Sequence, residues 1–83
     1  MLELFQFEGC PFCEHVREAL DGLGLDYIIR TVPRDPARRQ EVFEISGQDL
    51  VPVLRDPERS VVVADSAEII AYLRSHYGSS ASS

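Results

Sequence analysis

The chain has 83 residues, of which 45% are hydrophobic and 27% are charged, and its formal net charge is −6 at pH 7. This length allows one small domain with a single modest core. The acidic balance argues against a nucleic-acid partner, because phosphates require a basic surface. The N-terminal apolar stretch has no basic leader and is too short for a signal peptide or a membrane span. We therefore expect a cytoplasmic protein that binds neither nucleic acid nor membranes.

The first two expected elements meet at a Cys-x-x-Cys motif. Hydrophobic residues alternate over residues 2–7, which predicts a short strand. Over residues 11–23 they recur at steps of three and four, which predicts a helix, and Gly24 is the expected stop beyond it. The motif Cys10-Pro11-Phe12-Cys13 therefore lies where a strand passes into a helix.

A second strand and a second helix are expected next. Residues 25–32 are rich in β-branched and aromatic side chains, which is typical of a strand. Asp35 is a favourable N-cap and Pro36 suits the first helical position, so the second helix is expected to begin there. Gly47 is expected to end this helix.

The last third of the chain predicts a hairpin and a third helix. Residues 52–55 and 60–63 have the composition of two short strands. Residues 56–59 join them and carry proline at the second position of a predicted type I turn. Asp65 begins the pattern of a capping box, so a third helix is expected to open there and to stop at Gly78.

The expected elements follow the order β-α-β-α-β-β-α. A helix between the first two strands indicates a parallel pair with a right-handed crossover. The last two strands are close enough in the chain to form an antiparallel hairpin. The predicted fold class is therefore α/β, with a four-stranded mixed sheet and three helices on its two faces. We expect residues 1–77 to form this domain and the Ser-rich residues 78–83 to form a disordered tail.

The Cys-x-x-Cys motif carries the chemistry that the sequence suggests. Because proline suits the first position of a helix, Pro11 makes Cys10 the expected N-cap, with its sulfur near unpaired backbone N–H groups and the positive end of the helix dipole. That environment favours the thiolate, which is the form that attacks a disulfide. Cys13 lies one turn further on the same face, within reach of Cys10 for a disulfide. The spacing predicts an exposed attacking thiol at Cys10 and a shielded resolving thiol at Cys13.

Three motifs in this order resemble the glutaredoxin family and, equally, the N-terminal domain of glutathione S-transferases. The similarity extends over residues 1–77, and the motifs are Cys10-Pro11-Phe12-Cys13, Leu50-Val51-Pro52-Val53-Leu54 and Asp65-Ser66. The resemblance implies a thioredoxin-like fold and a small thiol–disulfide oxidoreductase. It also implies a binding site for a thiol such as glutathione next to the cysteines.

The resemblance assigns roles to single residues of that site. Pro52 would have a cis peptide bond beside the active cysteines, and Val51 would pair its backbone with the cysteinyl part of the ligand. Asp65 would receive the ligand's ammonium group, and Ser66 would bind a carboxylate through its N–H and hydroxyl. Phe12 takes the place of the family's usual tyrosine between the cysteines and completes the expected substrate-binding set.

Other positions differ from the glutaredoxin pattern. The lysine that commonly stands three residues before the first cysteine is Phe7 here. Residues 61–64 replace the glycine-rich approach to the last helix, which is more typical of transferases. The partner could therefore be glutathione, another low-molecular-weight thiol or a protein disulfide. A group of arginines could reach a ligand carboxylate or could form a solvated face; its members are Arg34, Arg38 and Arg39.

From these observations we expect a dithiol oxidoreductase that reduces protein or low-molecular-weight mixed disulfides. Cys10 would attack the substrate, and Cys13 or a small thiol would resolve the mixed disulfide. We expect neither a metal nor a tightly bound cofactor, with glutathione or another low-molecular-weight thiol as co-substrate. The expected partners are disulfide-bearing proteins and a reductase or thiol as electron donor, and the chain is expected to be a monomer.

Two alternatives are open from the sequence. The first is a dimer that carries an iron–sulfur cluster through Cys10 and an external thiol, because two cysteines per chain cannot supply four thiolate ligands. The second is a transferase-like module that binds a thiol and reduces nothing. We expect this module to be the least favoured, because the 83 residues include no helical second domain for the other substrate's pocket.

Overall fold

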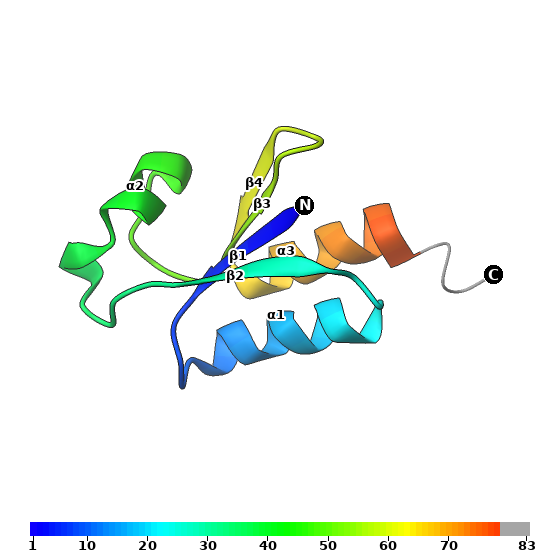
Figure 1. Ribbon diagram of the computed structural model, residues 1–83, viewed down its shortest axis with the longest axis horizontal. Coiled ribbons are helices and arrows are strands. Elements are labelled where there is room, and N and C mark those ends of the chain that lie inside the picture. Colours follow the sequence, from blue (N-terminus) through cyan, green and yellow to red (C-terminus); the bar gives the residue numbers. More distant parts are fainter. Residues whose placement is uncertain (79–83) are drawn as a thin grey trace.

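A computed structural model describes residues 1–78 and has the expected order of elements (Figure 1). The strands are β1 (Leu2–Gln6), β2 (Tyr27–Thr31), β3 (Val53–Asp56) and β4 (Val61–Ala64). The helices are α1 (Pro11–Gly22), α2 (Gln40–Ser46) and α3 (Ser66–Leu73), together with a 3₁₀ turn η1 (Pro36–Arg38) and a π-helical turn η2 (Arg74–Gly78). Within residues 1–78, no helix has the length and apolarity that crossing a membrane requires. The tail predicted for 78–83 lies outside the described residues from residue 79 onward.

The four strands form one mixed sheet in the order β2-β1-β3-β4. β1 pairs with β2 in parallel, with Leu2 opposite Tyr27, and with β3 in antiparallel, with Leu4 opposite Leu54. β3 and β4 form the antiparallel hairpin, each one residue later in the chain than predicted. The hydrogen bond from Arg59 N–H to the Asp56 carbonyl, at 3.2 Å, closes the predicted turn between them. The predicted α/β fold class is confirmed.

The main core lies between one face of the sheet and the helices α1 and α3, which run side by side along it (Figure 1). Successive strand residues point to opposite faces, so one set of apolar residues from β1 and β3 meets the apolar stripes of both helices. This cluster consists of Leu2, Leu4, Val16, Leu20, Leu54, Ile69 and Leu73. On the other face, Phe5 and Val53 pack under Val42 of α2.

The start and end of α1 follow from local sequence. Cys10 is the N-cap residue, and Pro11 is the first helical residue. At the other end, Gly24 has a φ of +68°, its N–H donates to the Asp21 carbonyl, and Leu25 N–H donates to the Leu20 carbonyl. These two bonds form a Schellman motif, which requires a left-handed residue and therefore favours glycine. The predicted end of the helix at Gly24 is confirmed.

The second helix is not continuous, and this part of the prediction is wrong. Asp35 caps a single 3₁₀ turn by accepting from Ala37 N–H at 3.0 Å. At Arg39 the backbone then leaves the helical region, with φ −100° and ψ 54°, before α2 begins. The side chain of Arg39 turns inward and is only 5% exposed, whereas a regular helix would have kept it on the polar surface. α2 ends at Gly47, as predicted.

Candidate functional site

The first thiol of the motif caps the helix that follows it. Cys10 has extended backbone dihedrals, and its Sγ accepts a hydrogen bond from Cys13 N–H at 3.3 Å. This is the arrangement that the position of Pro11 predicts. The expectation of an exposed Cys10 is wrong, because the residue is only 6% exposed. Capping explains the difference, since it folds the sulfur back over the first turn of α1 instead of turning it to solvent.

The second thiol is shielded, as the spacing predicts. Cys13 is fully buried. Burial and, to a smaller extent, a hydrogen bond with the side chain of Cys10 raise the pKa of its thiol from the ordinary 9.0 to about 12, although a backbone hydrogen bond with Phe7 acts in the opposite direction. Cys13 therefore remains a neutral thiol at physiological pH. Of the two sulfurs, Cys10 is the one in contact with a free N–H of the helix start.

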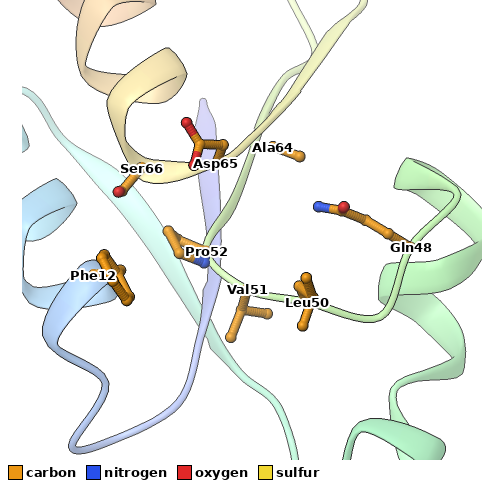
Figure 2. Close-up of a pocket in the computed structure, with 8 residues that line it drawn as sticks. All are labelled: Phe12, Gln48, Leu50, Val51, Pro52, Ala64, Asp65 and Ser66. Carbon is orange, nitrogen blue, oxygen red and sulfur yellow. The ribbon is translucent and has the colours of Figure 1, made fainter.

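A pocket of about 370 Å³ lies beside the motif and gathers residues from three separate parts of the chain (Figure 2). All five residues predicted to bind a thiol ligand line it, although they are up to 54 positions apart in the sequence. Phe12, which is 61% exposed, brings the Cys-x-x-Cys turn to its edge. The lining residues are Phe12, Gln48, Leu50, Val51, Pro52, Ala64, Asp65 and Ser66.

One wall of the pocket is the segment that connects α2 to β3. The Val51–Pro52 peptide bond is cis, and Pro52 is buried. The ladder between β1 and β3 begins only at Val53, so Val51 precedes the paired part of the strand. Leu50 is 60% exposed at the rim, and the amide of Gln48 points towards the space between the walls (Figure 2).

The opposite wall is the start of α3. Asp65 is its N-cap and accepts from Glu68 N–H at 3.3 Å, and Ser66 is the first helical residue. Asp65 is exposed and has a φ of +77°, a conformation that residues other than glycine rarely adopt. Of the eight lining residues, Asp65 is the one that carries a charge. The wall therefore combines a carboxylate with the free N–H groups of a helix start.

Sequence reasoning did not single out Gln48 and Ala64, and it named Leu50 only as part of a motif. Gln48 belongs to a polar connection with no periodicity, so only its position four residues before Pro52 could have indicated a place in the site. Ala64 ends a strand and has a small side chain that carries no chemical signal of its own.

The three arginines have different environments. Arg39 is buried and donates to three main-chain carbonyls, so it belongs neither to a solvated face nor to the pocket lining. Arg34 donates to the Glu8 carbonyl at 3.3 Å, and its guanidinium lies 5.7 Å from the ring centre of Phe7. Arg38 is exposed. Phe7, at the position where glutaredoxins commonly have lysine, makes cation–π contacts with Arg34 and Arg39 through its ring.

Comparison with known proteins identifies a matching family model and several similar proteins. Residues 4–81 match the family model described as "Glutathione S-transferase, N-terminal domain". An uncharacterized glutaredoxin-like 8.6 kDa protein in the rubredoxin operon of Clostridium pasteurianum is 29% identical over 69 residues, which are 83% of this chain and 92% of that protein. Prostaglandin E synthase 2 of Mus musculus is 36% identical over 77 residues, which are 90% of this chain and 19% of that protein.

Solved structures give the same fold. A glutathione transferase homologue from Drosophila mojavensis, with bound glutathione, superposes with a TM-score of 0.83 at 30% identity. Glutathione Transferase E6 from Drosophila melanogaster superposes with a TM-score of 0.81 at 35% identity. Each match covers 93% of this chain and 35% of the other, so the chain spans about a third of these transferases. The fold is thioredoxin-like and corresponds to a transferase N-terminal domain.

Proposed function

Because the chain belongs to the glutathione S-transferase N-terminal domain family, we propose that its pocket binds a low-molecular-weight thiol and that Cys10 uses it in thiol–disulfide exchange. The glutaredoxin-like relative from Clostridium pasteurianum, similar over most of both chains, supports the exchange chemistry. The transferase homologue with bound glutathione supports a thiol of that class as the ligand. In this proposal the domain is an oxidoreductase of the glutaredoxin type.

The observation that carries the proposal is the hydrogen bond from Cys13 N–H to Cys10 Sγ. A sulfur that accepts from a helix N-terminus is stabilised as an anion by the N–H group and by the helix dipole. The neighbouring thiol, whose pKa is raised to about 12 by burial and by Cys10, stays protonated. The pair therefore contains one nucleophile and one reserve thiol.

The reaction proceeds in two exchanges. The Cys10 thiolate attacks one sulfur of a substrate disulfide, the substrate S–S bond breaks, and the departing thiolate takes up a proton. Cys10 is then neutral in a mixed disulfide, so its negative charge no longer contributes to the raised pKa of Cys13. Cys13 loses its proton and attacks Cys10, the second substrate thiol leaves, and two electrons have passed from the cysteine pair to the substrate. Two molecules of a low-molecular-weight thiol reduce the Cys10–Cys13 disulfide again.

The pocket supplies the groups that would hold a γ-glutamyl thiol next to Cys10. Asp65 would bind the ammonium group, and the N–H groups at Ser66 would bind a carboxylate. Val51 precedes the strand ladder, so its backbone is available to pair with an extended ligand. These contacts would leave the ligand sulfur towards Phe12 and the Cys-x-x-Cys turn.

Two serine variants test the proposal, and each is the matched control of the other. The assay follows glutathione-dependent reduction of bis(2-hydroxyethyl) disulfide by the purified chain. Cys10→Ser should reduce the rate to the uncatalysed background, because the nucleophile is lost. Cys13→Ser should keep part of the activity, because a second glutathione can resolve the mixed disulfide. Activity retained in Cys10→Ser would overturn the proposal.

A thiol-binding module without reductase activity is the second candidate, and family membership together with the pocket favours it. It predicts that S-methylglutathione binds to the wild-type chain while bis(2-hydroxyethyl) disulfide is not reduced. Calorimetric titration with S-methylglutathione, run beside the reductase assay, separates the two candidates.

A further inference from the structure

Arg39 joins two connecting segments of the chain, one of which forms a wall of the candidate site. Its side chain is almost fully buried, and each of its three hydrogen bonds ends on a main-chain carbonyl. Nε donates to Pro33 at 2.8 Å and Nη2 donates to Arg34 at 2.9 Å, both in the connection between β2 and η1. Nη1 donates to Asp49 at 2.8 Å, in the connection between α2 and β3.

This arrangement suits arginine and no other residue. A guanidinium presents five N–H donors in a fixed planar fork, so it can bond several carbonyls at once. A buried cation is costly unless its donors are satisfied, and the three carbonyls provide that. The guanidinium also lies 5.1 Å from the ring centre of Phe7, within the range of a cation–π contact.

Two of the residues that Arg39 contacts, Asp49 and Phe7, adjoin the candidate site. Asp49 stands between Gln48 and Leu50, which line the pocket. Phe7 precedes Cys10 by three residues, and its backbone is hydrogen-bonded to the thiol of Cys13. One guanidinium therefore contacts the approach to the Cys-x-x-Cys turn and also the wall on which the ligand would rest.

We propose that Arg39 is a positioning residue that holds the wall formed by residues 48–52 in register with Cys10. The effect on exchange rests on the proposed function, whereas the effect on the wall does not. Without Arg39, the thiol of Cys10 keeps its place at the start of α1, but the ligand-binding wall is no longer fixed against it. The ability to dock a disulfide should then decrease while the reactivity of the sulfur itself is kept.

The test compares two reactions of Cys10 in a Cys13→Ser background, which prevents intramolecular resolution. Iodoacetamide needs no docking, whereas glutathione disulfide does. Arg39→Ala should slow mixed-disulfide formation with glutathione disulfide roughly tenfold or more, because small displacements of a docking surface have large effects on rate. Its alkylation rate should stay within about twofold of the parent, and Arg39→Lys should be intermediate because one ammonium cannot reach three carbonyls. Arg38→Ala, an exposed neighbour outside the pocket lining, is the matched control.

Two further readouts separate positioning from a merely structural role. Adding guanidinium chloride at a non-denaturing millimolar concentration should restore part of the exchange rate of Arg39→Ala and should leave Arg38→Ala unchanged. Hydrogen exchange should become faster at the amides of residues 48–51 in Arg39→Ala and Arg39→Lys, with α1 and the sheet unaffected. If Arg39→Ala does not fold, the mixed-disulfide rate of Arg39→Lys and its hydrogen exchange at residues 48–51 decide whether Arg39 positions the wall.

The outcomes distinguish this inference from the proposed function. A Cys13→Ser parent that forms no mixed disulfide with glutathione disulfide would overturn the proposed function, and the hydrogen-exchange data for residues 48–51 would still decide the role of Arg39. The inference would be overturned if folded Arg39→Ala and its parent formed the mixed disulfide at equal rates. It would also be overturned if alkylation and mixed-disulfide formation slowed to the same extent, or if the amides of residues 48–51 kept their protection from hydrogen exchange.

Discussion

The surroundings of the two ends of strand β3 differ in how their buried groups are hydrogen-bonded. Before its first residue, Pro52 borders the pocket beside the cysteines. At its last residue, Asp56 is 1% exposed and accepts from the hydroxyls of Tyr72 and Tyr77, each at 2.7 Å, and from Arg59 at 3.4 Å. The first end thus borders the same pocket as the Cys-x-x-Cys turn, whose buried ionisable group is Cys13 of α1, whereas the second end carries its own buried ionisable group, Asp56.

The number of donors decides what burial does at each end. Burial, together with the neighbouring Cys10, raises the pKa of Cys13 to about 12, and its one backbone hydrogen bond does not compensate for this. Burial also acts to raise the pKa of Asp56, but hydrogen bonds from Tyr72, Tyr77 and Arg59 outweigh it, so the pKa is lowered. A group with few donors stays neutral and can react later, whereas a group with three donors is a fixed charge. The first end is suited to chemistry and the second to holding the hairpin against the C-terminal helix.

The largest expected effect is the difference in reactivity between the two cysteines. A pKa raised from 9.0 to about 12 lowers the thiolate fraction of Cys13 at neutral pH roughly a thousandfold. Iodoacetamide at pH 7 should therefore label Cys10 and leave Cys13 unlabelled, as mass spectrometry of the digested chain would measure. Label on Cys13 should appear only as the pH rises towards 12 or after unfolding in urea, which is the control. Equal labelling of both cysteines in the folded chain would contradict this account.

At the other end, Asp56→Asn should lower the free energy of unfolding by about 1–2 kcal/mol, because three hydrogen bonds to a charged acceptor become bonds to a neutral one. Urea denaturation followed by circular dichroism measures the change. Glu58→Gln, which removes a carboxylate whose side chain is 77% exposed, should change stability by less than about 0.5 kcal/mol. The disulfide exchange rate of folded Asp56→Asn should equal that of the wild type.

The lowered pKa of Asp56 determines how its contribution to stability changes with pH. The pKa of Asp56 is lowered in the folded state, so its charge contributes stability above the ordinary value of 3.8, and that contribution is lost as the pH falls through the folded value. The stability difference between wild type and Asp56→Asn should therefore be constant between pH 5 and 7 and should shrink below about pH 3.8. A difference that persists at pH 2 would show that the acceptor's shape matters and its charge does not.

The parts of this molecule that depend on local sequence could be predicted. The proline after Cys10 determines where α1 begins, so the capping sulfur follows from neighbours in the chain. Gly24 and Gly47 end their helices for a similar local reason. That Val51 and Asp65 share one pocket was predictable only from the resemblance of the motifs to a known family. Nothing in the sequence between the two residues indicates that they lie close together.

The parts that depend on distant partners were not predicted. Arg39 stands among other arginines in a polar segment, and only the carbonyl of Asp49, ten residues later, and the ring of Phe7 make its inward orientation favourable. Asp56 is predicted as the first residue of a turn between two strands, where aspartate is common. Its burial depends on Tyr72 and Tyr77, which approach only when the third helix packs on the sheet. Polar groups that are buried through tertiary hydrogen bonds leave no periodic signal in the sequence.

The smallest expected effect concerns the backbone of Asp65, which caps α3 at a φ of +77°. Asp65→Gly should leave the free energy of unfolding unchanged or raise it by up to about 1 kcal/mol, because glycine relieves the strain and is a tolerable N-cap. Asp65→Ala should lower it by about 1 kcal/mol, because it loses the cap and keeps the strain. Both variants should weaken binding of S-methylglutathione, since both lack the carboxylate. Equal stabilities for the two variants would mean that this backbone is unstrained, whereas opposite signs would show that the site end of the sheet gives up stability to aim a carboxylate into the pocket.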